Sequence, residues 1–395
     1  MFASLAFVFL FGMLGAAVFE RMRLPRMIGM LLVGILIGPY ALGLLDPSIL
    51  AISGDLRKLA LMLILLRAGL SLDLGDLKKV GRPAIMMAFV PATFEVAAFV
   101  LFAPTILEIT HMEAAVMGAV LGAVSPAVVV PRMVRLMEEK RGTAQGVPQM
   151  IMAGASCDDV YVIVLFTTFA RMAQGGEVRL ADFAAVPCSI VLGALAGAAC
   201  GWLLSRFFAR CSLNHTMRTV AMLAVSCLLI AAEEWAKGSV AFSGLLAVMG
   251  MAVMIRRESP KPCAAALSGK VGQLWQAAEI LLFVLVGAAV DIRYTMEAGA
   301  GAVLMILLAL VIRSLGTALC VAGTKLTRRE RLFCVLAYLP KATVQAAIGA
   351  TPLAMGLDCG KIVLSVAVLA ILITAPMGAI AMDATYKRLL RADGE

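Results

Sequence analysis

The chain has 395 residues, of which 62% are hydrophobic and 15% are charged, and its mean hydropathy is +0.98. Such a composition excludes a protein that exposes its whole surface to water, and it is typical of a polytopic membrane protein. The net charge of +9 could by itself suggest nucleic-acid binding, but the positions of Lys and Arg along the chain explain it differently.

Polar interruptions divide the chain into about thirteen apolar segments, most of which can cross the ~30 Å hydrocarbon core as α-helices. The segments run over roughly 2–18, 27–45, 59–72, 83–106, 113–131, 146–170, 183–205, 219–232, 239–255, 273–290, 299–323, 332–355 and 362–382. The first lacks the basic start of a secretory signal, so we expect a retained helix in a chain that begins near Met1. The nine cysteines show no paired motif and no metal-ligand spacing. We therefore expect no disulfide, no resident metal and no cofactor.

Basic residues are unevenly distributed over the connections between these segments. The connections after odd-numbered segments and the C-terminal tail hold 24 Lys and Arg, against 7 in the other connections. Because cytoplasmic loops carry the excess of positive charge, the N-terminus is predicted outside and the C-terminus in the cytoplasm. The membrane is expected to be the cell (inner) membrane of a prokaryote. The surplus of basic residues is therefore explained by membrane topology. Membrane lipid, and not nucleic acid, is the expected partner.

Thirteen segments also fit two six-helix repeats of opposite orientation joined by one linker helix. We place the first inverted repeat at 1–174, the linker helix at 175–215, and the second repeat with a short tail at 216–395. The predicted fold is thus an all-α polytopic membrane protein.

Three residue pairs share an offset of 218 positions between the halves. They are Gly69 with Gly287, Asp73 with Asp291, and Glu95 with Arg313. Helices related by a two-fold axis can meet at that axis, so Glu95 and Arg313 are expected to form a structural or gating ion pair. Exchanging the two side chains should then restore folding lost in either single mutant.

Prolines occur inside the fifth segment of each half, at Pro126 and Pro340, which are 214 positions apart. A proline removes a helical hydrogen bond, and non-helical backbone at membrane depth survives only where it lines a cavity or is buried in protein. The two segments are therefore predicted to be interrupted helices that converge on a binding site. The alternative is a pair of ordinary proline kinks.

Two adjacent aspartates, Asp158 and Asp159, lie inside the apolar segment 146–170. Carboxylates at that depth are costly and usually functional. One helical position rotates them ~100° apart, so only one can face a cavity squarely. Two such neighbouring charges favour a site that holds a proton without a cation and releases it when a cation binds. Permanent salt bridges are the alternative, although few basic residues occur in the apolar segments.

Those basic residues are Arg67, Arg313 and Lys341. Snorkelling to the interface explains Arg67 as well as function does. Lys341 could offset the carbonyl end of the first half-helix or neutralise an aspartate, and the sequence does not choose. Glu279 is explained equally by a cytoplasm-side pair with Lys and by an ion path, and Cys157 is expected to serve packing.

Four strings together resemble the NHA-type sodium/proton exchangers (solute carrier 9B-like) of the cation:proton antiporter superfamily, over essentially the whole chain. They are LLRAGLSLDL (65–74), LGAVSPAVVVPRM (121–133), ASCDDV (155–160) and LPKATVQAAIG (339–349). The resemblance implies that Asp159 is the essential cation- and proton-binding carboxylate and Asp158 its partner. It further implies a homodimer whose dimer domain supports a mobile core domain, both interleaved across the repeats. The residues it assigns to the crossing interrupted helices are Ser125, Pro126, Pro340, Lys341, Thr343 and Gln345.

We therefore predict a secondary antiporter, not an enzyme, that exchanges Na⁺ or Li⁺ for H⁺ by alternating access at Asp158 and Asp159. A K⁺/H⁺ exchanger on the same scaffold is the nearest alternative, because selectivity depends on cavity dimensions. An uncoupled ion sensor or channel would leave the paired helix breaks without a reason. An intramembrane aspartyl protease would need a Gly-x-Gly-Asp context, which is absent from the sequence.

Overall fold

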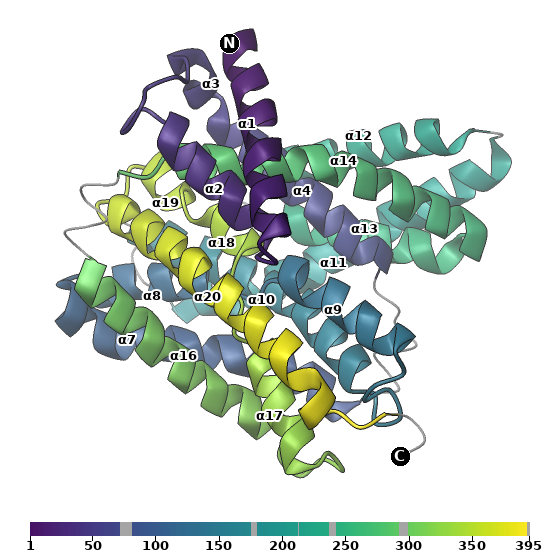
Figure 1. Ribbon diagram of the computed structural model, residues 1–395. Coiled ribbons are helices and arrows are strands. Elements are labelled where there is room, and N and C mark those ends of the chain that lie inside the picture. The colour runs from purple at the N-terminus through teal and green to yellow at the C-terminus, as the bar shows by residue number, and fades with distance from the viewer. Residues whose placement is uncertain (72–80, 175–179, 212, 237–241, 292–298, 393–395) are drawn as a thin grey trace. The chain divides into compact units, whose positions relative to one another are not determined.

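The computed structural model describes residues 1–71, 81–174, 180–211, 213–236, 242–291 and 299–392, and its named elements there are all helices (Figure 1). The repeat match that involves Asp73 lies outside the described residues. In chain order the helices are α1 (Phe2–Arg21), α2 (Arg26–Ile37), α3 (Pro47–Ala51), α4 (Ser53–Ser71), α6 (Arg82–Met87), α7 (Val90–Leu107), α8 (His111–Leu121), α9 (Pro126–Glu138), α10 (Val147–Ala173), α11 (Leu180–Arg210), α12 (His215–Trp235), α13 (Gly244–Glu258), α14 (Lys261–Ala288), α16 (Gly299–Val321), α17 (Arg328–Ala337), α18 (Thr343–Ile348), α19 (Thr351–Ala354) and α20 (Gly360–Leu389).

The helices confirm the predicted class of fold. Within the described ranges, 9 helical stretches are long and apolar enough to cross a membrane. They fall on nine of the predicted segments, whereas the other four coincide with helices that are shorter or more polar. The polytopic all-helical architecture is therefore confirmed, and the number of thirteen crossings stays a prediction.

Two helix boundaries differ from the prediction for local reasons. The helix predicted over 27–45 ends earlier than expected, because α2 stops at Ile37. Pro39 follows two positions later, and the residue before a proline is disfavoured in the helical conformation. The helix predicted over 273–290 begins earlier than expected, because α14 starts at Lys261. Proline in the first turn, followed by an alanine run, favours that earlier start.

The chain forms two compact units that interleave in sequence. The first unit comprises residues 1–54, 74–176 and 280–395, and the second comprises 55–73 and 177–279. These are units of contact and do not coincide with the two predicted repeats. The repeat boundaries stay a prediction.

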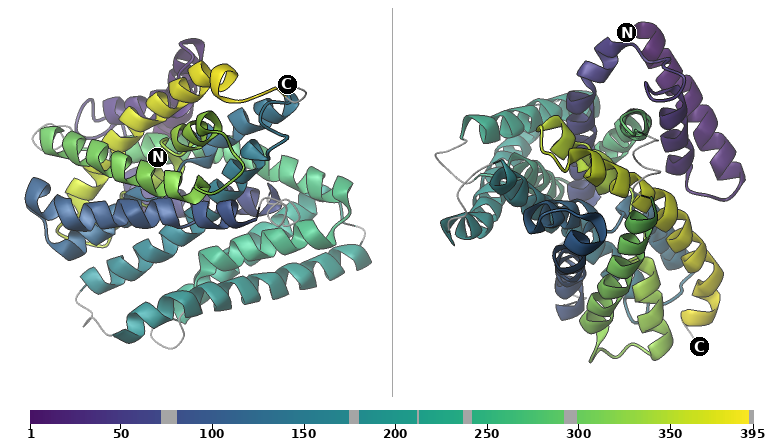
Figure 2. Two further views of the ribbon diagram at one scale, coloured as in Figure 1. Left: turned by 90° about the horizontal axis from the view of Figure 1, so that it is seen from below. Right: turned by 90° about the vertical axis from the view of Figure 1, so that its left-hand side faces the viewer.

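In the first unit, α7 runs beside α16, and α8 packs against both α7 and α10 (Figures 1 and 2). The long helix α20 contacts α8, α16 and α17. The N- and C-terminal ends of the chain lie at opposite ends of this unit in Figure 1 and in the right-hand view of Figure 2. Such an arrangement suits termini predicted on opposite sides of a membrane.

In the second unit, α13 packs along α11 and also contacts α12. Glycines permit this close approach. A Cβ at Gly201 of α11 would lie 2.5 Å from the carbonyl oxygen of Met251, and one at Gly69 of α4 would lie 2.7 Å from that of Met249. Small residues at such contacts are a common means of close helix packing in membranes.

The glycine pair from the repeat match occupies equivalent contacts. Gly69 lies against α13 in the second unit, and Gly287 of α14 lies against Leu31 of α2 in the first. The first contact joins the third predicted segment to the ninth, and the second contact joins the tenth segment to the second. A two-fold axis that relates the two halves would interchange these two contacts. The matched contacts support two related halves.

A further matched pair is a capping box, which the sequence analysis did not use. Thr110 and Glu113 form one at the start of α8, and Thr327 and Glu330 form the other at the start of α17. In each box the threonine accepts from the glutamate's backbone N–H while the carboxylate accepts from the threonine's N–H. The Thr-x-x-Glu spacing is a sequence-level signal for a helix start.

Candidate functional site

The two proline-containing segments are interrupted and meet at their breaks. The chain leaves the helical conformation between Leu121 and Pro126, and again between Ala337 and Thr343. The backbone N–H of Ser125 donates to the carbonyl oxygen of Pro340 at 2.8 Å. Proline suits the first turn of α9 because its missing N–H would have no intrahelical partner there.

The carbonyl groups at the end of α8 are satisfied by side chains from the second half of the chain. A helix end leaves such carbonyls without partners and with partial negative charge. The donors come from α16, from the second break and from α18. Lys341 donates to Leu121, Arg313 to Gly122, and Gln345 to Ala123.

Arg313 is fully buried and connects both breaks to two carboxylates. Its Nη1 donates to Glu95 Oε2 at 2.8 Å and its Nη2 to Asp158 Oδ2 at 3.1 Å. Its Nε donates to the carbonyl oxygen of Tyr338 at 2.8 Å, and its guanidinium lies 5.7 Å from the centre of the Tyr338 ring. Every edge of the planar guanidinium is therefore engaged, which a lysine could not reproduce.

Glu95 is shared between two cations. Besides Arg313, the Lys341 ammonium donates to Glu95 Oε2 at 2.7 Å, and both side chains are 1% exposed. The backbone N–H of Lys341 donates to Thr374 Oγ1 on α20 at 2.9 Å. The sequence left open whether Lys341 offsets the carbonyl end of the half-helix before it or neutralises an aspartate. Its ammonium instead donates to Leu121 at the carbonyl end of α8. Its carboxylate partner in the described structure is Glu95 and not an aspartate.

The two aspartates have different surroundings. Asp158 Oδ2 accepts from the backbone N–H of Val124 at 2.7 Å and from Arg313. Asp159 is 2% exposed and makes no hydrogen bond or ion pair with any described residue. One carboxylate is therefore held in the network, and its neighbour is buried without a donor.

The structure distributes the remaining predicted residues as follows. Ser125 Oγ lies 3.5 Å from Thr343 Oγ1, so both belong to the meeting point of the breaks. Arg67 is exposed on α4, and Glu279 is buried on α14, both within the second unit. Cys157 is partly exposed. The cluster thus brings together residues from the first unit alone.

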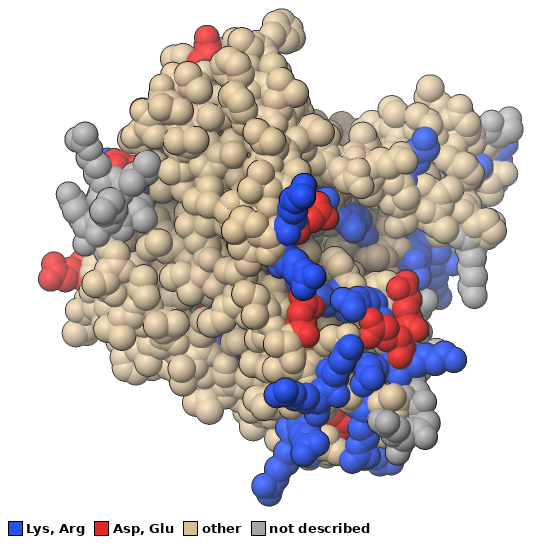
Figure 3. All heavy atoms as spheres, in the orientation of Figure 1, with Lys and Arg blue, Asp and Glu red and all other residues tan. Residues whose placement is uncertain are grey.

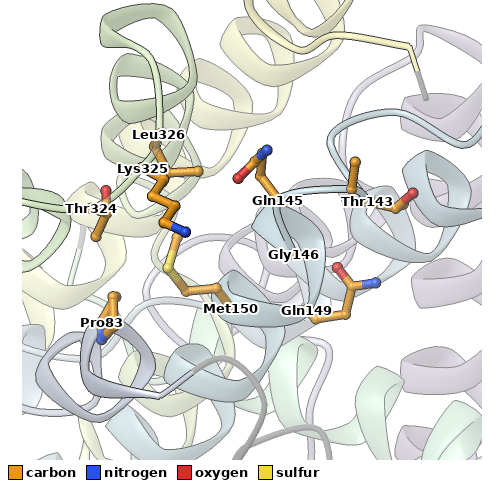
Figure 4. Close-up of a pocket in the computed structure, with 10 residues that line it drawn as sticks. Pro83, Thr143, Gln145, Gly146, Gln149, Met150, Thr324, Lys325 and Leu326 are labelled. Atoms are coloured by element: carbon orange, nitrogen blue, oxygen red, sulfur yellow. The ribbon is translucent and has the colours of Figure 1, made fainter. Parts of the chain in front are cut away.

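A cavity of about 470 Å³ adjoins the first turn of the helix that carries the aspartates (Figure 4). Lys325 and Met150 point toward one another across it, and Gln149 lines it as well. Asp158 lies eight residues beyond Met150, or ~12 Å along the helix at 1.5 Å per residue. Neither aspartate is among the residues that line the cavity.

Tyr338 and Gly154 are site residues that the sequence analysis missed. A Cβ at Gly154, one turn before Asp158 on α10, would collide with the Tyr338 hydroxyl. That hydroxyl is buried and has no hydrogen-bond partner among the described residues. The signal available in the sequence was an aromatic residue with a polar tip two positions before the proline of the break.

Comparison with known proteins identifies related sequences over nearly the whole chain. A family model described as "Sodium/hydrogen exchanger, transmembrane" matches residues 5–384. The chain is 32% identical over 381 residues to "Sodium/hydrogen exchanger 9B2" of Mus musculus, covering 93% of this chain and 69% of the relative. It is 34% identical over 387 residues to the protein of the same name from Homo sapiens, covering 93% and 70%.

A solved structure shares the fold. The chain resembles that of "the sodium proton antiporter MjNhaP1 from Methanocaldococcus jannaschii at pH 8" with a TM-score of 0.85 and 18% identity. The match covers 98% of this chain and 97% of that one. At this identity the likeness establishes the arrangement of helices.

Proposed function

This chain belongs to the sodium/hydrogen exchanger family, and we propose that it is a secondary antiporter exchanging Na⁺ or Li⁺ for H⁺ by alternating access. Asp159 is the proposed carboxylate that holds either the cation or the proton, and Asp158 is its partner. The observation that carries the proposal is the unpartnered, buried carboxylate of Asp159 beside an Asp158 that is already engaged.

The charge balance of the cluster supports one exchangeable positive charge. Three carboxylates, of Glu95, Asp158 and Asp159, accompany two cations, of Arg313 and Lys341. With all five ionised, one negative charge remains uncompensated in a buried site, where an isolated charge is costly. Either one proton or one monovalent cation removes that cost, so the two compete for the same place.

The donor atoms suit a hard cation. Oδ1 of Asp158, Oδ1 of Asp159 and Oε1 of Gln345 are buried oxygens without hydrogen-bond donors among the described residues. Oxygen ligands of this kind are preferred by hard metal ions. When Asp159 is protonated instead, its carboxyl group can donate a hydrogen bond. The site therefore carries no net charge in either the cation-bound or the protonated state.

The same balance supports exchange of one proton for one Na⁺. Arg313 stays protonated, and Lys341 is bonded to Glu95 and to a helix carbonyl. If only Asp159 changes its occupant during the cycle, equal charge moves in each direction. Exchange should then be electroneutral.

The surroundings of the protein follow from the same proposal. We place the chain in the cell (inner) membrane of a prokaryote, with its N-terminus outside and its C-terminus in the cytoplasm. The distribution of Lys and Arg over the connections supports that orientation. A homodimer, implied by the family resemblance, is proposed as the working assembly and can be tested by the mass of the purified protein in detergent.

The experiment compares wild type, Asp159→Asn and Asp358→Asn in proteoliposomes that contain a pH-sensitive dye. A Na⁺ gradient should drive proton movement in the wild type and in Asp358→Asn, an exposed aspartate outside the cluster. The Asp159→Asn variant should fall to the level of protein-free vesicles, because its amide cannot exchange a proton for a cation. Clamping the membrane potential with valinomycin and K⁺ should leave the wild-type rate unchanged.

The outcomes separate the alternatives. Full activity of Asp159→Asn would overturn the site assignment, and a potential-dependent rate would overturn electroneutrality. A response to K⁺ alone would identify a K⁺/H⁺ exchanger. Folded protein that moves protons with neither cation would indicate an uncoupled sensor or channel.

A further inference from the structure

A strongly basic cavity lies at the end of the first unit where α17 begins and α20 ends. Its volume is about 450 Å³. Five of its lining side chains are basic: Arg328, Arg329, Lys387, Arg388 and Arg391. No Asp or Glu is among the lining residues. Figure 3 shows Lys and Arg gathered over this end of the molecule, where α9 also ends.

None of the five cations forms an ion pair with a carboxylate within the part of the chain that the structure describes, although Lys387, after Arg135, contributes to lowering the pKa of the Glu139 carboxyl. Other arginines at this end are paired. Arg132 Nη2 lies 2.9 Å from Asp383 Oδ2, and Arg135 Nε lies 2.7 Å from Glu139 Oε1. Glu330 is adjacent in sequence but is buried in the capping box with Thr327. The cavity therefore holds an excess of positive charge without ion-pair partners, whereas the arginines beside it are paired.

Membrane topology alone does not account for this arrangement. The positive-inside rule explains basic residues near helix ends. It does not explain why two segments nearly sixty positions apart line the same cavity. Like charges held together also repel one another, which disfavours the folded state unless an anion binds.

The wall of the cavity is fixed by backbone contacts. The N–H of Gly142 donates to the carbonyl oxygen of Arg391 at 2.9 Å, and Arg141 forms an antiparallel bridge with Ala392. Tyr386, one turn before the end of α20, is buried and lies 5.8 Å from Lys387 Nζ. The end of α20 and residues 391–392 are thus anchored, so little ordering is needed before a ligand can bind.

We infer that this cavity binds a phosphate-bearing anion that carries two or more negative charges. Arginine forks match phosphate oxygens in a bidentate manner, and four of the five cations are arginines. The volume lies within the ~300–1,000 Å³ usual for small-ligand sites. The phosphate could belong to an anionic lipid headgroup or to a soluble polyphosphate, and the experiment distinguishes these sources.

Such a ligand would connect two helices that meet again at the ion site. It would bridge the start of α17 and the end of α20, and the break that follows α17 is held to α20 by the Lys341–Thr374 hydrogen bond. Binding should therefore raise the thermal stability of the protein. The inference does not depend on the exchange activity, because it is tested by binding and unfolding.

The first arm measures binding of pyrophosphate to the full-length protein in neutral detergent by calorimetry and thermal unfolding. Wild type should bind at low salt and unfold at a higher temperature with pyrophosphate present. Arg388→Gln/Arg391→Gln should bind at least ~10-fold more weakly, because two charge-assisted contacts are lost. The matched control Arg21→Gln/Arg23→Gln removes two exposed cations at the end of α1, away from the cavity, and should bind like wild type.

The second arm measures flotation of the same three proteins, in neutral nanodiscs, with phosphatidylcholine vesicles that contain or lack phosphatidic acid. Cavity-dependent binding to phosphatidic acid vesicles identifies a lipid headgroup, and cavity-dependent binding to pyrophosphate alone identifies a soluble ligand. Equal loss in the control would mean unspecific charge attraction and would overturn the site. Binding by neither probe would overturn it as well.

The acidic residues Asp393 and Glu395 follow in the sequence and lie outside the described residues. The variant Asp393→Asn/Glu395→Gln keeps the five cations while removing two negative charges that follow Ala392 in the sequence. Its affinity for pyrophosphate should equal or exceed that of wild type. A loss of affinity would contradict recognition by the basic side chains.

Discussion

Arg313 joins groups from four separate segments of the first unit. It contacts Glu95 of α7, Asp158 of α10, and the carbonyl oxygens of Gly122 and Tyr338 at the two breaks. Removing one partner of a buried charge network typically costs ~3–5 kcal/mol, because the remaining charge is left uncompensated. At the scale of single residues, this arginine is therefore the structural centre of the cluster.

The network changes the result expected from exchanging Glu95 and Arg313. A simple ion pair would tolerate the exchange, but an arginine at 95 would face the Lys341 ammonium, and a glutamate at 313 would face Asp158. We therefore expect the double variant Glu95→Arg/Arg313→Glu to unfold at least as readily as either single variant. Thermal unfolding of the purified proteins in detergent measures this.

A matched control for that exchange is the partly exposed ion pair between Arg132, in the middle of α9, and Asp383 of α20, whose Nη2 and Oδ2 atoms are 2.9 Å apart. Ion pairs near the protein surface contribute only ~0–1 kcal/mol, so Arg132→Asp/Asp383→Arg should unfold much closer to the wild-type temperature than the buried exchange does. Recovery of wild-type stability in the buried exchange would contradict the shared network.

At the scale of elements, the interrupted helices satisfy one another. Carbonyl groups at the end of α8 accept from side chains of the second half, and Ser125 donates its N–H across to Pro340. Neither break would be stable alone, because unpaired backbone groups are costly in an apolar environment. The Tyr338 side chain adds a steric contact between the second break and α10 at Gly154.

We expect Gly154→Ala to destabilise the protein by ~1–3 kcal/mol, because the added methyl group would overlap the Tyr338 hydroxyl. The combination Gly154→Ala/Tyr338→Phe removes that hydroxyl but leaves Met87 Cβ 2.9 Å from the added methyl group, so it should recover part of the loss. Thermal unfolding of the single and combined variants measures the coupling.

Gly269 of α14 provides the comparison, since a Cβ there has no atom within 4 Å. Gly269→Ala should leave stability unchanged or raise it by ~0.5–1 kcal/mol through reduced backbone freedom. If Gly154→Ala behaved in the same way, the steric contact with Tyr338 would not be important.

At the scale of the whole molecule, charge should set the orientation in the membrane. The excess of Lys and Arg predicts the end of α20 in the cytoplasm and the turn after α2 outside. In a cysteine-free background, Leu44→Cys should react with a membrane-impermeant maleimide in intact cells. Arg388→Cys should react only after permeabilisation, and both side chains are exposed.

The reverse pattern of labelling would show that the orientation is inverted. Labelling of both positions in intact cells would instead indicate leaky membranes, so an intracellular protein is labelled in parallel. Mapping the remaining connections in the same way would also count the membrane crossings.

The sequence by itself determined that this chain is a helical membrane protein, where both interrupted helices break, and which charged residues lie within the apolar segments. These properties are local, because hydropathy, proline geometry and the cost of a buried charge act through single residues and short segments. Pro126 and Pro340 accordingly lie at the breaks, and Asp158 and Asp159 are buried. The end of α2 and the start of α14 were less predictable, since helix boundaries depend on weak local preferences.

Apart from Glu95 and Arg313, which the repeat offset already paired, only the tertiary structure decided which groups meet. Lys341 and Glu95 are 246 positions apart, and Asp158 and Arg313 are 155 apart. No local pattern shows that Lys341 binds Glu95 and a helix end, or that Asp158 is engaged while Asp159 is not. These partners are set by packing between distant segments, and a buried charge takes whichever partner the fold places within reach.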